Sequence, residues 1–247
     1  MIAIRNRFHV CELFGIPIYI DFSFLILLII FVTSERSLSM GISTALVLAI
    51  SVVLHELAHS LTARAFGYRT NDITISLLGG CASLIALPRK AWQEFLTALA
   101  GPLMSFALAI AVILLDVFHV RVENDYLRAV LQYTFYLNLM LGAFNLLPGF
   151  PMDGGRIFRS VMRAFMSRAR ATFVAMWVGR VFAILLALKG LHSIFTGGGF
   201  GFITILIAWM IWREGYREYL LAKRESDFRN WTQEDFDARV SPPPYER

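Results

Sequence analysis

The sequence predicts an all-α polytopic membrane protein with about six transmembrane helices and a small membrane-associated β element. The chain is 57% hydrophobic and only 17% charged, whereas globular domains are about 45–50% apolar and about 25% charged. The apolar residues also fall in long blocks: residues 95–115 and 129–152 contain no formally charged side chain. Runs of this length match the roughly 20 residues that a helix needs to cross the hydrocarbon core.

The elements follow from the composition of successive segments. Residues 1–20 mix β-branched and aromatic residues, which predicts an extended interfacial segment. The first helix is expected from Asp21, acting as its N-cap, to Thr33. The later helices are expected at 41–66, 93–118, 127–149, 171–195 and 200–220. Arg180 interrupts the apolar run of the fifth helix, 171–195, and its side chain either snorkels or faces the bundle interior.

Lys and Arg residues predict the topology. They collect before the first helix, between the second and third, between the fourth and fifth, and after the sixth. By the positive-inside rule, both termini are cytoplasmic and residues 21–223 form a six-helix core, which we expect in the plasma membrane. Residues 224–247 are polar and predict a cytoplasmic tail. The net charge of +5 does not indicate nucleic-acid binding, because the basic residues are not gathered on one soluble segment.

The second expected helix carries a metal-binding pattern. His55 and His59 are four residues apart in SVVLHELAHSLTARAFG, so they project from one helix face and can bind one ion. Glu56 lies between them and can act on water as a general base. Ionisable side chains inside an apolar span are costly, so their presence favours a functional site.

A catalytic zinc site needs a third protein ligand and an open position. Asp153 is the candidate, in NLLPGFPMDGG after the fourth expected helix, although Asp-Gly-Gly by itself is also a common turn. His55 precedes the cytoplasmic end of its helix at Arg64 by nine residues, which places it roughly 13 Å below the surface. The fourth helix runs in the same direction, and the irregular Pro/Gly backbone can return Asp153 to that depth.

Five segments together resemble the site-2 protease family of intramembrane zinc metalloproteases. In order they are GIPIYIDFSF, HELAHSLTARAFG, LLGGCASL, ALAGPLMSF and NLLPGFPMDGGR, and they lie within residues 10–165. The resemblance implies a six-helix core that binds one Zn²⁺ per chain. It supports His55, His59 and Asp153 as metal ligands and Glu56 as the base.

The resemblance also implies a substrate. The expected reaction is hydrolysis of peptide bonds within or near transmembrane segments of other membrane proteins, as in regulated intramembrane proteolysis. Asn145 is expected to contact substrate or the developing oxyanion. Residues 73–85, with Gly79 and Gly80, form either a structural hairpin or an edge that binds an unwound segment as an added strand. The expected partners are a transmembrane protein and the lipid bilayer.

Two positions depart from the family pattern, Ser105 and Asp21, and neither is expected to touch the ligands. Two other classes of protein remain open. A metal or ion transporter can also place His and Asp in a membrane, but it has no need for Glu56 between two histidines. A catalytically inactive relative that binds membrane helices is the other alternative, and the presence of all three ligands and the base argues against it.

Overall fold

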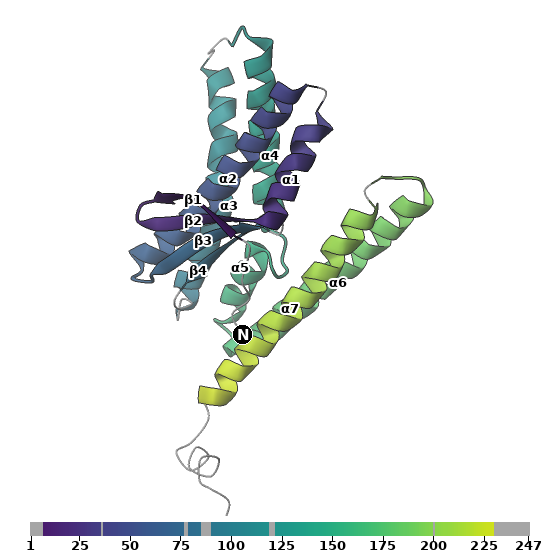
Figure 1. The fold of residues 1–247 in the computed structure, drawn as a ribbon. Coiled ribbons are helices and arrows are strands. Elements are labelled where there is room, and N and C mark those ends of the chain that lie inside the picture. Colours follow the sequence, from purple (N-terminus) through teal and green to yellow (C-terminus); the bar gives the residue numbers. More distant parts are fainter. Residues whose placement is uncertain are drawn as a thin grey trace, which may run out of the picture. The chain divides into compact units, whose positions relative to one another are not determined.

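The structure is a computed structural model, and it describes most of the chain in two compact units. The described residues are 7–35, 37–76, 79–84, 90–118, 122–199 and 201–229. They form seven helices and one four-stranded sheet, in the order β1–β2–α1–α2–β3–β4–α3–α4–α5–α6–α7 (Figure 1). Unit 1 comprises Met1–Leu147 and Met152–Ser160, and unit 2 comprises Pro148–Pro151 and Val161–Arg247. The expectation of a mainly helical chain with a small β element is confirmed.

The sheet of unit 1 joins two segments that are far apart in the sequence. Its strands, in spatial order, are β1 (Arg7–Leu13), β2 (Ile16–Asp21), β3 (Thr70–Ser76) and β4 (Gly79–Leu84). β1 and β2 form an antiparallel hairpin, and β3 and β4 form another. The two hairpins meet through a parallel pairing in which Ile18 lies opposite Ile73. The described part of the N-terminal segment, from residue 7 onward, therefore forms one half of this sheet.

Four helices of unit 1 lie side by side, with the sheet across one end of them (Figure 1). They are α1 (Phe22–Ser34), α2 (Leu38–Ala65), α3 (Ala91–Val117) and α4 (Asp125–Asn145). Asp21 caps α1, since its carboxylate accepts a hydrogen bond from the Ser23 backbone N–H at 2.9 Å, which confirms the predicted N-cap. α2 is central and contacts α1, α3 and α4.

The apolar core of unit 1 fixes α2 against the sheet. Alternate residues of two neighbouring strands point inward and are at most 1% exposed, as expected for period-two burial of a sheet face. They pack against α1 and α2 in one cluster formed by Ile16, Ile18, Phe24, Val52, Leu57, Ile73 and Ile75. Because Val52 and Leu57 flank His55 in sequence, this core also fixes the position of the metal-binding pattern on α2.

The segment after α4 contains a helix that was not predicted. α4 ends at Asn145, four residues before the expected boundary, and α5 (Asp153–Met162) begins directly at Asp153. The start of α5 approaches the end of α4 closely: a Cβ added at Gly154 would collide with the backbone carbonyl oxygens of Leu146 and Leu147. A residue without a side chain is therefore required next to the candidate ligand.

Unit 2 is built around a helical hairpin of α6 (Arg168–Phe195) and α7 (Gly201–Arg229). The helices approach closely at one end, because a Cβ at Gly190 would lie 2.8 Å from the Gly201 carbonyl oxygen. α7 continues six residues into the predicted polar tail, which was expected to begin at residue 224, whereas residues 230–247 lie outside the described part of the chain.

Arg180 does not interrupt α6, because its charge is placed against aromatic rings. The guanidinium carbon lies 4.9 Å from the ring centroid of Trp177, 4.5 Å from that of Trp212 and 5.7 Å from that of Tyr216. Cation–π contacts of this length are favourable, particularly where water is excluded. The guanidinium therefore lies within the hairpin, against one ring of α6 and two of α7.

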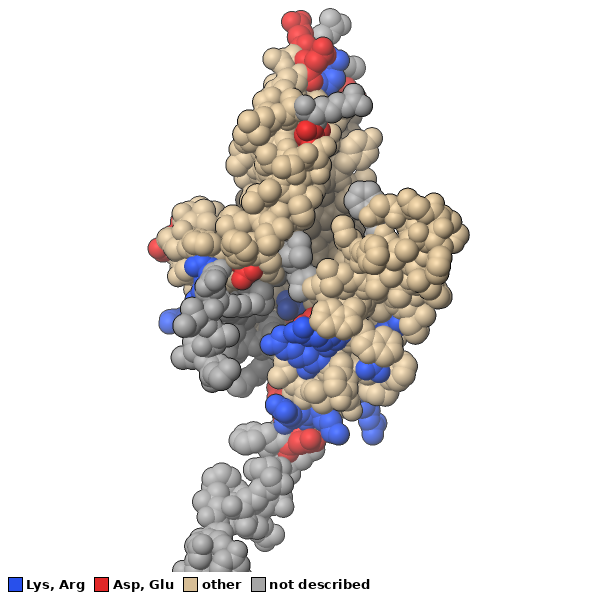
Figure 2. All heavy atoms as spheres, turned by 45° about the vertical axis from the view of Figure 1, so that its right-hand side comes forward, with Lys and Arg blue, Asp and Glu red and all other residues tan. Residues whose placement is uncertain are grey.

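Three of the described helices are long and apolar enough to cross a membrane: α2, α3 and α6. The expected number of six spans is therefore not confirmed by length and composition. On the face that Figure 2 shows, the walls of the helices carry few Lys, Arg, Asp or Glu residues, and the charged side chains gather toward the helix ends. This distribution is that of helices whose apolar walls face lipid.

Candidate metal centre

The two histidines of the HELAH segment lie on one face of α2, as their spacing predicts. His55 is 2% exposed and His59 is 6% exposed. Their Nε2 atoms face each other at 3.2 Å. Both side chains are thus withdrawn from solvent and directed to the same point.

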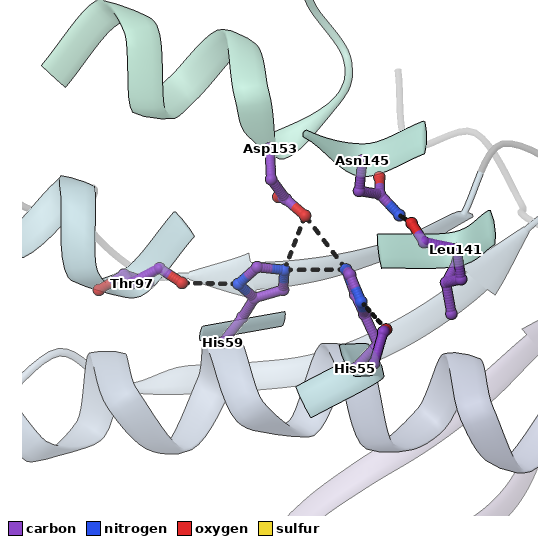
Figure 3. Close-up of polar contacts among 7 residues, drawn as sticks. His55, His59, Thr97, Leu141, Asn145 and Asp153 are labelled. Carbon is purple, nitrogen blue, oxygen red and sulfur yellow. Dashed lines mark hydrogen bonds and ion pairs between the residues drawn. The ribbon is translucent and has the colours of Figure 1, made fainter. Parts of the chain in front are cut away.

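Asp153 completes a triangle with these two nitrogens (Figure 3). Its Oδ2 lies 3.1 Å from His55 Nε2 and 3.1 Å from His59 Nε2. In a tetrahedral zinc site with bonds of about 2.0–2.1 Å, neighbouring ligand atoms lie about 3.3 Å apart. The three buried side chains therefore form a group able to hold one metal ion.

The outer nitrogens of the imidazoles determine what the inner ones can do. His59 Nδ1–H donates a hydrogen bond to the Thr97 backbone carbonyl at 2.6 Å. Because a carbonyl oxygen only accepts, the Nε2 of a neutral His59 carries a lone pair toward the triangle. The Asp153 carboxylate is also electron-rich, so the centre of the triangle requires a positive charge, either a proton or a metal ion.

Ser105 touches a candidate ligand, and the expectation that it would not is wrong. Its Oγ lies 2.9 Å from His55 Nδ1, and the side chain is fully buried. Partners of this kind hold a metal-binding imidazole in orientation and set its tautomer. Ser105 on α3 thus orients His55 while Thr97, two turns earlier on the same helix, orients His59. The contact was missed because it depends on how α3 packs against α2, which residue spacing does not reveal.

Gly101, also on α3, leaves the space in front of the imidazoles free. A Cβ at this position would collide with His59 Nε2 and lie 2.6 Å from His55 Nε2. Any other residue type would therefore occupy the space where the two nitrogens meet an ion. The signal for this residue was present in the ALAGPLMSF segment, although its role was not recognised there.

The surroundings of Asp153 favour a negative charge on its carboxylate. Both imidazole Nε2 atoms lie 3.1 Å from its Oδ2, and Arg156 is close enough to interact with the carboxylate electrostatically. The residue also lies in the first turn of α5, where the helix dipole favours negative charge. The ionised carboxylate is the form that binds a metal ion.

The other predicted site residues are Glu56, Asn145, Gly79 and Gly80. Glu56 is 8% exposed and close enough to His59 to interact with it electrostatically. Asn145 uses its side-chain N–H to donate to the Leu141 carbonyl within α4, at 3.0 Å (Figure 3). Gly79 and Gly80 lie in β4, paired with Ser76 and Ile75 of β3. None of these contacts assigns a chemical role.

The chain is similar in sequence to known metalloproteases. The family model of Peptidase family M50 matches residues 43–126 and 117–188. A zinc metalloprotease of Methanocaldococcus jannaschii is 33% identical over 223 residues, which cover 89% of this chain and 62% of that protein. A relative from Synechocystis sp. is 33% identical over 249 residues, covering 94% of this chain and 64% of that protein. The chain thus spans less than two thirds of the length of both relatives.

The fold of this chain is also similar to that of a solved protease structure. The site-2 protease from Methanocaldococcus jannaschii superposes with a TM-score of 0.65 at 31% sequence identity, covering 86% of this chain and 95% of that one. The resemblance inferred from the five sequence segments is confirmed by these matches.

Proposed function

Because this chain belongs to Peptidase family M50, we propose that it is an intramembrane zinc metalloprotease. Its reaction is the hydrolysis of peptide bonds within or near transmembrane segments of other membrane proteins. The observation that carries this proposal is the buried triangle of His55, His59 and Asp153, with edges of 3.1–3.2 Å. It lies in a unit whose long helices α2 and α3 are apolar enough to cross a membrane.

His55, His59 and Asp153 are the proposed ligands of one Zn²⁺ per chain. When bound, the ion supplies Lewis acidity that activates water and polarises a peptide carbonyl. Glu56 follows His55 directly on α2 and is the proposed general base. Its carboxylate takes a proton from the attacking water and passes it to the leaving amine. Burial of the site excludes bulk water and strengthens each of these electrostatic contacts.

Substrate binding is the second part of the proposal. β4 lies at one edge of the described sheet, in the order β1-β2-β3-β4. An unwound substrate segment has unpaired backbone groups and can add to such an edge as a further strand. Gly79 and Gly80 in β4 leave room for a close approach of the two backbones. Asn145, at the end of α4, is proposed to contact the substrate or the oxyanion with the part of its amide that Leu141 does not engage.

The proposed setting is a six-span core in the plasma membrane with both termini in the cytoplasm. α2, α3 and α6 supply three candidate spans. The basic residues at the ends of the apolar blocks support the orientation. The partners that follow are a transmembrane substrate and the surrounding lipid.

The test replaces the base and leaves the ligands in place. Membrane proteins that accumulate uncut in cells carrying Glu56→Gln identify substrates, which are then incubated with purified zinc-loaded protein. Glu56→Gln should retain zinc and lower cleavage by about 10²–10⁴-fold. Glu123→Gln, the same change at an exposed position, should cleave normally. Undiminished cleavage by Glu56→Gln would remove Glu56 from the mechanism. Ion flux through proteoliposomes without cleavage would favour a transporter instead.

A further inference from the structure

A second buried charged group lies in unit 1, outside the metal triangle. Arg159 of α5 is 1% exposed, and Glu94 in the first turn of α3 is 5% exposed. The Arg159 Nε and Nη2 atoms each lie 2.7 Å from Glu94 Oε1. Removing two full charges from water costs more than most such pairs regain, so a buried ion pair is weak evidence for stability. Its presence therefore calls for another explanation.

The two helices that this pair joins both contribute to the metal centre. On α3, Glu94 lies three residues before Thr97, whose carbonyl orients His59 at 2.6 Å. The two residues share a helix face because they are about one turn apart. On α5, Arg159 lies six residues after Asp153, about 9 Å along the helix axis. The ion pair thus connects α5, which supplies the ligand Asp153, to α3, which orients the ligand His59.

The need for such a tie follows from how α5 is attached. α5 has only ten residues and follows an irregular Pro- and Gly-containing segment, so it does not continue the axis of α4. Apolar packing alone permits two helices to slide, whereas a guanidinium that gives two hydrogen bonds to a carboxylate favours a narrow range of positions. Zinc ligands must stay within about 0.2 Å of their ideal distances.

We propose that Glu94 and Arg159 are positioning residues that hold α5 against α3, so that Asp153 stays within bonding distance of the ion shared with His55 and His59. This inference rests on the proposed zinc site. It assigns the pair no contact with substrate or metal. Its loss weakens metal binding by displacing Asp153, and outer partners of metal ligands typically contribute about 10–100-fold to affinity.

The test separates positioning from stability. A single neutralisation leaves an uncompensated buried charge and can unfold the protein, so the main variant is the apolar double substitution Glu94→Leu/Arg159→Met. The zinc Kd is measured on full-length purified protein by competition with a chelator, and the thermal midpoint is measured on the zinc-free form. We expect a midpoint close to that of the unaltered protein and a zinc Kd that is about 10–100-fold higher.

Two further variants complete the design. Asp21→Ala, in the same unit, lowers stability by removing the N-cap of α1 and should leave the zinc Kd unchanged. Arg159→Lys keeps the charge but loses the two-pronged contact, so its zinc Kd should rise by a smaller factor. A zinc Kd of the double variant within about twofold of that of the unaltered protein overturns the proposal. If the double variant does not fold, the same result in Arg159→Lys overturns it.

The proposed function fails in a different way. If His55→Ala leaves the zinc Kd of the otherwise unaltered chain unchanged, the zinc site itself is wrong. If His55→Ala abolishes binding while the double variant binds zinc normally, only the positioning role is lost.

Discussion

Replacement of Gly101 by alanine adds one methyl group at the most crowded point of the metal centre. The new Cβ would collide with His59 Nε2 and lie 2.6 Å from His55 Nε2, whereas ordinary contacts begin near 3.4 Å. Unless α3 itself shifts, the His55 imidazole must therefore move by about 0.8 Å and the His59 imidazole by more, which is several times the tolerance of about 0.2 Å on a metal–ligand distance. α3 itself gains, because alanine is better than glycine in a helix by about 1 kcal/mol.

We therefore expect Gly101→Ala to fold and to lose function. A displacement of about 1 Å at a catalytic centre can cost about 10²-fold in rate, and loss of one ligand should raise the zinc Kd by at least a similar factor. The assay is zinc content after dialysis, together with the cleavage rate on an identified substrate. Gly199→Ala is the matched control, since a Cβ there meets nothing within 4 Å. Full zinc content and normal cleavage in Gly101→Ala would refute the claim that the ion lies between these two nitrogens.

Three further substitutions test Asp153 as a ligand, Ser105 as the partner of His55 and Asp21 as the cap of α1. Asp153→Asn removes the ligand charge at nearly constant shape and should lower zinc retention, measured by competition with a chelator; unaltered retention would exclude it as a ligand. Ser105→Ala removes the partner of His55 Nδ1 and should raise the zinc Kd by about 10–100-fold, and a Kd equal to that of the unaltered protein would contradict an orienting role. Asp21→Ala removes the α1 cap and should lower the free energy of unfolding by about 1 kcal/mol. Asp21→Asn keeps a capping oxygen and should retain most of that stability. Equal losses in both variants would show that the cap hydrogen bond is not responsible.

Local chemistry made much of the metal centre predictable from the sequence. The four-residue spacing of His55 and His59 needs only a helix to bring both imidazoles to one face, and α2 provides it. Asp153 required a longer argument, from the shared direction of two spans and a chain break rich in proline and glycine. The structure brings it to 3.1 Å from both histidines.

The features that were not predicted depend on packing between distant segments. The parallel pairing of β2 with β3 joins residues more than 50 positions apart, and no local pattern encodes that choice. The contact of Ser105 with His55 and the ion pair of Glu94 with Arg159 likewise arise from the way α3 meets α2 and α5. α5 was missed because Asp-Gly-Gly favours a turn by propensity, whereas here it starts a helix.

The proposed function requires that one ion is bound jointly by two residues of α2 and the first residue of α5. Anomalous diffraction at the zinc absorption edge, from crystals of the zinc-loaded protein, locates that ion. We expect a single strong peak about 2.0–2.2 Å from His55 Nε2, His59 Nε2 and an Asp153 carboxylate oxygen. A peak bound by the two histidines with Asp153 turned away, or a peak elsewhere in the protein, would contradict it.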